Sequence, residues 1–515
     1  MSVNKILIIL GTVSALLWGF VIWMSFGIPQ SVCSFLDKVS FGLIHGEIMR
    51  MTNGFHYDVN NHDMPTVVFL IVFALLFLIY LFTIFKCEKG RDKKHALGII
   101  LFFAVIFRII LLPSVLIHEN DIYRYLWDGK SAVHQVNPYK YASADLFMHE
   151  SGFEKDFYDD YKDITIKGKG FTAHDKAQLD KLIGLRDANP TYYARIGHWQ
   201  VPTIYPPMAQ LVFMLSALLK ADSILLMKVI FALFDIGIIF LIILLLKHLG
   251  KDPRMCVIYA WSPLVLKEFA NSGHYDPVVI FFSMAGIYLF LRKKALSGMF
   301  VLALATLSKF FSVVFLPFLA RHYKKSLLFI FFGIVGVAYY PFLVWGQTGF
   351  SGVFEGLTTY NKQWAYNAGI FALIRVVIEA LHPAGDSLVL SKFIVLLLYV
   401  ALLIVLYLRK DDSDDGILRK CFCAVAGLFI LNPVGDPWYF CWVIPFLCIF
   451  PYRSWILLSG LLVFSYINFR TDSSFVDLKF MQISAVSWVI YLPFLMAIVV
   501  EWLLERKISV RKAAA

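Results

Sequence analysis

The sequence contains little charge. Only 16% of its 515 residues are Asp, Glu, Lys or Arg, whereas 59% are hydrophobic and 17% are aromatic. Mean hydropathy is +0.71. A soluble chain of this length needs far more polar surface, so the composition excludes a soluble globular protein.

Cysteine and strand-like alternation are also scarce. Of 7 cysteines only Cys33 falls in a segment that we expect outside the membrane, so neither a disulfide framework nor a metal-site spacing emerges. Runs such as Val229 to Leu246 lack the ten-residue alternation of a membrane barrel. Instead, apolar runs of about twenty residues recur throughout, enough to cross a hydrocarbon core about 30 Å thick. The sequence predicts an all-α polytopic membrane protein.

The few charges are unevenly placed. Lys and Arg outnumber Asp and Glu by 47 to 36, and they gather between the apolar runs. The clusters are Lys86 to Lys94, Lys247 to Arg254, Arg292 to Lys294, Arg321 to Lys325, Arg409 to Lys420, Arg453, and Arg506 to Lys512. The positive-inside rule makes these the cytoplasmic connections, so the net charge of +11 needs no nucleic-acid partner. Both termini are then expected to be cytoplasmic.

This sidedness predicts about 13–14 transmembrane helices. The first, Ile6 to Phe26, is too long for a signal peptide and lacks a cleavage site. The others are Val67–Phe85, Ala96–Ile117, Leu225–Leu246, Cys256–Phe269, Val278–Phe290, Phe300–Leu319 (turning back near Lys309), Ser326–Val344, Lys392–Leu408, Cys421–Asn432, Trp438–Phe450, Trp455–Ile467 and Ser487–Leu503.

Two long segments are expected on the external side, residues 118–205 and 346–388. Loops of this length usually carry function. Within the first, Phe153 to Asp187 is polar and resembles a small subdomain; Tyr205–Leu219 and Ile370–Leu381 fit only as interfacial or re-entrant segments. We predict three parts: a two-helix addition (1–94), a catalytic membrane module (95–345) and C-terminal membrane helices (346–515).

The first external loop opens with the block HENDIYRYLWDG, which places Glu119, Asp121, Arg124 and Asp128 just beyond a helix end. Sugar transfer needs a carboxylate to take the acceptor's proton and positive groups to stabilise the departing phosphate. The alternative is that these charges anchor a helix end at the interface.

Further along, NSGHYDP joins two short apolar segments and supplies His274 and Asp276, suited to a phosphate and to sugar hydroxyls. A plain helix turn with an Asp cap and a Pro is the alternative. Lys309 stands within an apolar run. An ammonium group there is costly and usually faces a cavity or an anion.

Aromatic turns complete the external set. PTIYPP contains Tyr205 and two prolines that start a helix, NPVGDPWY contains Asp436, Trp438 and Tyr439, and QWAYN contains Trp364 and Asn367. For PTIYPP the favoured interpretation is architectural, a rigid helix start at the membrane surface. For the other two motifs, sugar stacking and membrane-interface anchoring explain the residues equally well.

Taken in order, these motifs resemble the GT-C superfamily of polyprenyl-phosphate-sugar-dependent glycosyltransferases, particularly its bacterial mannosyltransferase-like branch. The resemblance spans Arg108 to Tyr439: DIYRYLWDG with NPY, then PTIYPP, NSGHYD, a lone membrane Lys and a PWY turn.

The resemblance implies a GT-C-like helical membrane fold whose large first external loop carries the catalytic base, Asp121, with Glu119 beside it. Arg124, His274 and Lys309 would counter the donor phosphate. The sugar or acceptor would contact Asp128, Tyr205, Asp276, Trp364, Asp436, Trp438 and Tyr439. Glu119 stands where relatives usually have Asp, which leaves open whether a divalent cation, Mg or Mn, binds at Glu119 and Asp121.

The predicted function is inverting transfer of one hexose, mannose being the family's commonest case, from a polyprenyl-phosphate donor to a glycolipid, polysaccharide or protein. The predicted location is a bacterial inner membrane with an external active site. The alternatives are a transporter or flippase for a lipid-linked or anionic substrate, and a ligase or polymerase using lipid diphosphates. Transporters place polar groups near midplane on broken helices, whereas most acids here lie beyond helix ends.

Overall fold

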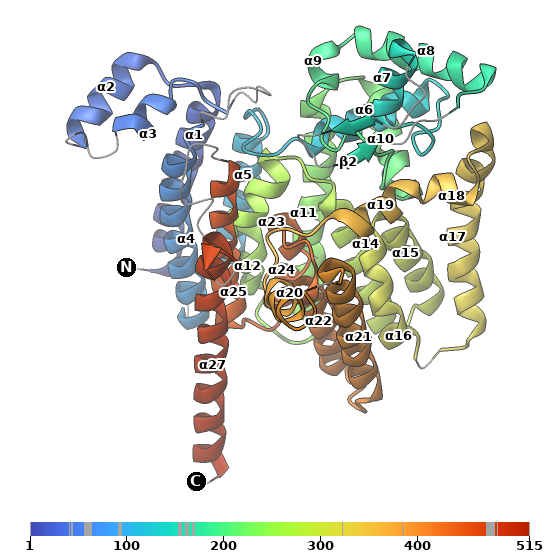
Figure 1. The fold of residues 1–515 in the computed structure, drawn as a ribbon. Coiled ribbons are helices and arrows are strands. Elements are labelled where there is room, and N and C mark those ends of the chain that lie inside the picture. The colour runs from blue at the N-terminus through green and yellow to red at the C-terminus, as the bar shows by residue number, and fades with distance from the viewer. Residues whose placement is uncertain are drawn as a thin grey trace.

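The computed structural model (Figure 1) is almost entirely helical. It describes residues 2–40, 42, 45–55, 64–90, 95–152, 157–159, 164–166, 170–321, 323–383, 385–469, 479–480 and 483–513. Three residues of the first predicted basic cluster (91, 93 and 94) and most of the polar stretch 153–169 lie outside these ranges. Their predicted roles therefore stay predictions.

Six helices in the described part are long and apolar enough to cross a membrane. The spans are Val3–Phe26 (α1), Thr66–Lys89 (α4), Ile224–His248 (α11), Ser326–Gln347 (α17 Ser326–Val344 with the turn η4 Trp345–Gln347), Ser387–Leu408 (α21) and Ala485–Arg506 in α27 (Ala485–Ala513). A membrane-spanning helix satisfies its own backbone hydrogen bonds, which is why these runs are helical. The predicted class is confirmed: the protein is an all-α, multi-pass integral membrane protein.

Several other apolar segments form short or broken helices. The shorter apolar helices are α5 (Ala96–Leu111), α10 (Pro207–Leu219), α15 (Ala295–Ser308), η3 (Phe310–Phe315) and α16 (Leu316–Ala320). The chain bends by 119° between the segment Pro263–Asn271 and α14 (Asp276–Leu291). The run 256–269, predicted as one span, is divided among η1 (Pro253–Cys256), α12 (Val257–Ala260), α13 (Pro263–Val265) and the π-helical η2 (Leu266–Asn271).

The C-terminal third is interrupted in the same way. After α22 (Asp414–Leu431) the chain forms α23 (Pro437–Phe440), α24 (Ile444–Leu447), α25 (Arg453–Leu461) and η5 (Leu462–Phe469). Proline occupies one of the first two positions of α13, α14, α23 and α24. Proline fits there because those amides have no partner within the helix, and it cannot extend a preceding helix. The prolines therefore mark the breaks.

The described residues between 118 and 205 form a folded cap at one end of the helical bundle (Figure 1). It contains α6 (Asp121–Val133), α7 (Ser143–Ser151), the antiparallel pair β1 (Phe157–Asp159) and β2 (Ile164–Ile166), α8 (Ala173–Asp187) and α9 (Pro190–Tyr193). Helix α6 packs on α10, and a Cβ at Gly129 would lie 2.3 Å from the carbonyl oxygen of Phe213. Glycine permits this close approach, which fixes α6 over the membrane part.

Further short elements complete the described part of the chain. They are α2 (Gln30–Val39), α3 (His45–Arg50), α18 (Gly349–Val353), α19 (Glu355–Gln363), α20 (Ile370–Leu381) and the two-residue strands β3 (Lys479–Phe480) and β4 (Ile483–Ser484). Of these, α19 and α20 belong to the second external segment predicted from the sequence.

Buried polar contacts tie the bundle together beneath the cap. Arg108 of α5 donates to both carboxylate oxygens of Asp235 of α11, at 2.7 and 3.2 Å, and the hydroxyl of Tyr259 donates to the same carboxylate at 2.7 Å. Both charged side chains are buried. Because a buried charge without its partner is costly, this pair fixes α5 against α11.

Candidate active site

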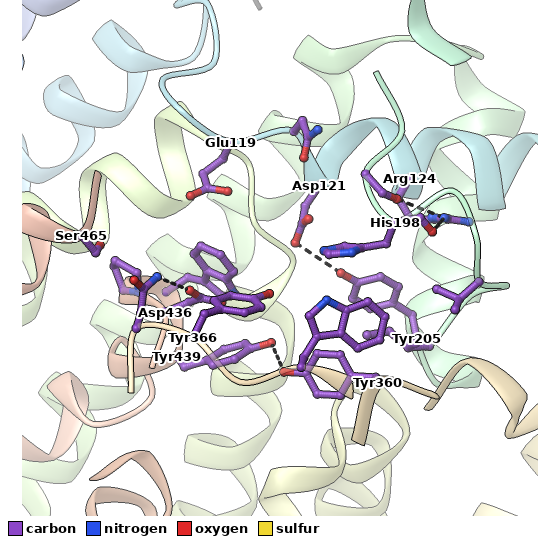
Figure 2. Close-up of a pocket in the computed structure, with 18 of the residues that line it drawn as sticks. Glu119, Asp121, Arg124, His198, Tyr205, Tyr360, Tyr366, Asp436, Tyr439 and Ser465 are labelled. Atoms are coloured by element: carbon purple, nitrogen blue, oxygen red, sulfur yellow. Dashed lines mark hydrogen bonds between the residues drawn. The ribbon is translucent and has the colours of Figure 1, made fainter. Parts of the chain in front are cut away.

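A cavity of about 410 Å³ lies where the cap meets the membrane helices (Figure 2). Its wall combines the start of α6, the turn before Tyr205, the end of α19 and the turn before α23. Eight predicted site residues line it: Glu119, Asp121, Arg124, Tyr205, Trp364, Asp436, Trp438 and Tyr439. The structure thus brings together residues separated by more than three hundred positions in the sequence.

Two buried polar side chains form hydrogen bonds with the backbone of the segment that precedes Asp121. Lys228 of α11 donates to the carbonyl oxygens of Leu111 and Ser114, both at 3.2 Å. Asn271 donates to the carbonyl of Val115 at 2.8 Å and accepts from the amide of Ile117 at 3.1 Å. These bonds fix the chain just before α6, and so they place Asp121 at the cavity.

Asp121 is the first residue of α6 and faces the cavity. The hydroxyls of Tyr125 and Tyr205 each lie 3.4 Å from its Oδ2, and Nδ1 of His274 lies 3.6 Å from the same atom. Burial opposes ionisation, but the close contact and charge of His274, with charge from His198 and Lys309, lower the pKa of Asp121. An ionised carboxylate beside a cavity can accept a proton.

His274 reaches Asp121 because the preceding residue is glycine. Gly273 has φ +68, and a Cβ there would lie 2.7 Å from Cδ1 of Ile122 in α6. Both the left-handed backbone and the close approach favour glycine. The buried ring of His274 stacks on Trp438, with centroids 4.2 Å apart and planes 16° apart. This stacking fixes the plane of the imidazole next to Asp121.

Two other carboxyl groups face the cavity with raised pKa values. Burial raises the pKa of Glu119; charge from Lys267 and His274 opposes this, and nearby acids reinforce it. Burial likewise raises the pKa of Asp436 to about 7, partly opposed by a hydrogen bond from Asn367 and reinforced by the charge of Asp121. Among these three acids Asp121 alone has a lowered pKa, which makes it the best proton acceptor.

The wall opposite α6 is held to the turn before α23 by backbone pairing. The amide of Tyr366 donates to Pro433 at 3.1 Å, and the amide of Gly435 donates to the carbonyl of Tyr366 at 3.0 Å. Next to it, Nδ2 of Asn367 donates to Asp436 at 2.9 Å, while its Oδ1 accepts from Asn468 at 2.9 Å. The second segment predicted to be external thereby becomes part of this cavity wall.

Lys309 and Asp276 lie behind this wall, in contact with it. The ammonium of Lys309 is 2.7 Å from Oδ1 of Asp276, which also accepts from Nε1 of Trp442 at 2.6 Å. The same ammonium lies 4.9 Å from the ring centroid of Tyr439, which lines the cavity. The structure therefore pairs two predicted ligands with each other; neither lines the cavity, and their predicted roles stay predictions.

Two residues of the DIYRYLWDG block have local partners. Arg124 lines the cavity, but one of its amino groups donates to the carbonyls of Gly197 and His198, at 3.1 and 2.8 Å. Asp128 does not line the cavity and is buried between α6 and α10, with Gln210 Nε2 at 3.4 Å. Burial raises the pKa of Asp128 to about 6, against the charge of Arg124 and hydrogen bonds from Thr203 and Gln210.

Part of the cavity wall is formed by residues that no sequence pattern had indicated. Several lining residues were not singled out, among them His198, Tyr360, Tyr366, Tyr466 and Asn468. Behind the cavity, Lys267 and Glu268 were also overlooked because they fell inside a predicted span. Two adjacent charges within an apolar run were an available signal, since such residues are rare in membranes and usually functional.

The described residues contain no group of three or more His, Cys, Asp or Glu side chains arranged to hold a metal ion. Glu119 and Asp121 do face one cavity. Binding of Mg or Mn by these two carboxyl groups alone stays a prediction.

The fold and this cavity define a class: a polytopic membrane protein with an enzyme-like site between its helices and a folded cap. Within that class, the profile of the MptA_B family, described as alpha-(1->6)-mannopyranosyltransferase, N-terminal domain, matches residues 189–324. The match confirms the predicted resemblance to a mannosyltransferase family and supports a glycosyltransferase. No curated protein and no solved structure matches the chain. The matched segment includes Tyr205, His274, Asp276 and Lys309, and Asp121 lies before it.

Proposed function

We propose that the protein transfers one hexose, most simply mannose, from a polyprenyl-phosphate donor to an acceptor hydroxyl on the external face of the membrane. The observation that carries the proposal is the position of Asp121. It is a cavity-facing carboxylate with a lowered pKa, flanked by two tyrosine hydroxyls and an imidazole. A group of this kind suits a general base.

In the proposed reaction, Asp121 takes the proton of the acceptor hydroxyl. The acceptor oxygen bonds to the anomeric carbon while the bond from that carbon to the phosphate oxygen breaks, and both bonding electrons leave with the polyprenyl phosphate. Direct displacement inverts the anomeric centre. Because phosphate is already a good leaving group, one base and nearby positive groups suffice, without a nucleophilic residue.

An apolar groove supports a lipid-linked donor. It has a volume of about 740 Å³, lies between α10, α15 and α17, and is lined almost wholly by aliphatic and aromatic side chains. It begins at Pro207, two residues after Tyr205 of the cavity, and includes Leu307, two residues before Lys309. We propose that the polyprenyl chain lies there, with its phosphate toward Arg124, His274 and Lys309.

The aromatic and polar wall supports a sugar ligand. Trp364, Tyr366 and Tyr439 face the cavity beside Asn367 and Asp436. Flat rings beside a few amide and carboxyl groups suit the apolar faces and the hydroxyls of a sugar. In this proposal Tyr205 orients Asp121, and Glu119, in its protonated form, donates a hydrogen bond.

Assaying purified protein against defined donors tests the proposal. We expect transfer from a polyprenyl-monophosphate mannose to a mannoside acceptor, with no transfer from a diphosphate-linked oligosaccharide. Transfer from the diphosphate alone would identify a ligase or polymerase. Binding of either lipid without product would contradict an enzyme and favour a transporter.

A further inference from the structure

Behind Asp121 lies a row of three charged or ionisable residues buried in the protein. His274 has Nδ1 3.6 Å from Oδ2 of Asp121 and Nε2 3.3 Å from Oε2 of Glu268. Glu268 is in turn 3.4 Å from Nζ of Lys267. Glu268 and Lys267 are 0% exposed and the His274 side chain is 1% exposed. The row therefore connects the cavity with the interior.

The geometry of this row is fixed by the backbone. The amide of His274 donates to the carbonyl of Glu268 at 3.1 Å, closing the turn between η2 and α14. The ammonium of Lys267 lies 3.8 Å from the ring centroid of Tyr466, another cavity-lining residue. Neither imidazole contact is a well-directed hydrogen bond, and Oε1 of Glu268 has no hydrogen-bond partner among the described residues. The carboxylate therefore acts on His274 chiefly by its charge.

We propose that Glu268 is a positioning residue, which keeps His274 protonated and turned toward Asp121 so that the base remains ionised. The inference rests on the proposed function, since it assigns Asp121 the role of base. Charge arithmetic supports it. Two neighbouring carboxylates favour the protonated form of His274. If Glu268 were neutral, the buried imidazole would keep only Asp121 and more distant acids as counter-charges, and its protonated form would be less favoured.

Other charged groups also act on this row. Glu119 and Asp436 lie on the cavity side of His274, Lys267 lies beyond Glu268, and His198 and Lys309 act on Asp121. None of the cations has the position of His274, which alone contacts both Asp121 and Glu268. Neutralising Glu268 is therefore the most selective way to remove the charge of His274.

The test is the pH dependence of kcat/KM for Glu268→Gln, which keeps the size of the side chain and removes its charge. In the wild type the acid limb reports protonation of the base. In the variant we expect this limb to move to higher pH by about one unit or more, because a neutral His274 no longer favours ionised Asp121. A purely structural role would lower kcat/KM equally at every pH. An unchanged midpoint would overturn the inference.

Two companion variants keep the test decisive. His274→Gln is expected to move the acid limb in the same direction, and the double variant with Glu268→Gln is expected to move it no further. Should Glu268→Gln fail to fold, an unchanged midpoint in His274→Gln would by itself overturn the inference. Activity in Asp121→Asn would contradict the proposed function, whereas an inactive Asp121→Asn with an unshifted Glu268→Gln would contradict only the positioning role.

Discussion

The ammonium of Lys309 lies 2.7 Å from Oδ1 of Asp276, at the point where the chain leaves α15 and its backbone becomes extended. This pair explains how an apolar run accommodates a lysine. Removing one partner leaves the other charge without a counter-charge in a buried site, which typically lowers the free energy of unfolding by about 3–5 kcal/mol. We expect Lys309→Met and Asp276→Asn each to lower the thermal unfolding midpoint strongly in detergent, and the double variant to regain part of the loss. Losses that simply add would show that the two side chains do not interact.

A second prediction concerns Gly273, whose backbone is left-handed and whose missing Cβ leaves room for Ile122. Gly273→Ala should cost about 1–2 kcal/mol for the backbone alone, with a further penalty from the contact with α6. Because His274 follows directly, we expect transfer activity to fall as well.

Gly250→Ala is the matched control for this substitution. Gly250 has φ +65, close to that of Gly273, but a Cβ there would meet nothing within 4 Å. The control should lose comparable backbone stability and keep normal turnover. Equal effects of both variants on activity would contradict a role for the close approach to Ile122.

The pKa of Asp436, raised by burial to about 7 from an ordinary 3.8, predicts a dependence of stability on pH. The folded protein then holds this proton more tightly than the unfolded chain does. Stability from this group therefore falls as pH rises from about 4 to 7, by up to about 1.4 kcal/mol per pH unit.

Asp436→Asn tests that linkage, since it keeps a neutral side chain at every pH. Thermal midpoints measured at pH 5 and pH 8 should differ less in the variant than in the wild type. The carboxylate oxygen Oδ2 of Asp436 has no hydrogen-bond partner among the described residues, and the bond from Asn367 to Oδ1 and the charge of His274 only partly offset burial. An identical pH 5 to pH 8 difference in both proteins would refute the assignment.

The groove between α10, α15 and α17 predicts how the lipid part of a donor is bound. Gly333 of α17 lines it, and Gly336, on the same helix, does not; neither has atoms within 4 Å of an added Cβ. Gly333→Phe should displace lipid. Losing burial of about two CH₂ groups, at about 0.8 kcal/mol each, would raise the donor KM roughly tenfold. Gly336→Phe should leave the donor KM unchanged, and equal KM values in both variants would exclude the groove as the lipid site.

The sequence predicted the class, and it singled out many residues that line the candidate cavity, because both depend on local chemistry. Apolar run length fixes a membrane helix without any knowledge of its neighbours, and polar blocks between such runs stand out. The block around Asp121 and the turn with Asp436, Trp438 and Tyr439 were found in this way, and they line one cavity.

Features that depend on tertiary packing could not be predicted from the sequence. Asn367 was noted in its aromatic motif, but its position beside Asp436 depends on the pairing of the Tyr366 backbone with Pro433 and Gly435. The pairing of Lys309 with Asp276 joins positions 33 apart that the sequence assigned to different ligands. The breaks in the predicted spans could have been predicted from the sequence, because prolines such as Pro263 and Pro437 occupy helix starts.

The most direct test of the central claim is the rate of mannose transfer from a polyprenyl-monophosphate donor by Asp121→Asn, with Asp180→Asn as control. Asp180 is an exposed aspartate of α8 in the same cap, and it does not line the cavity. Loss of a general base predicts a decrease in kcat of about 10²–10⁴-fold in Asp121→Asn. The control Asp180→Asn should keep both its thermal stability and its activity. Asp121→Asn protein that is folded and transfers mannose at the wild-type rate would contradict the account.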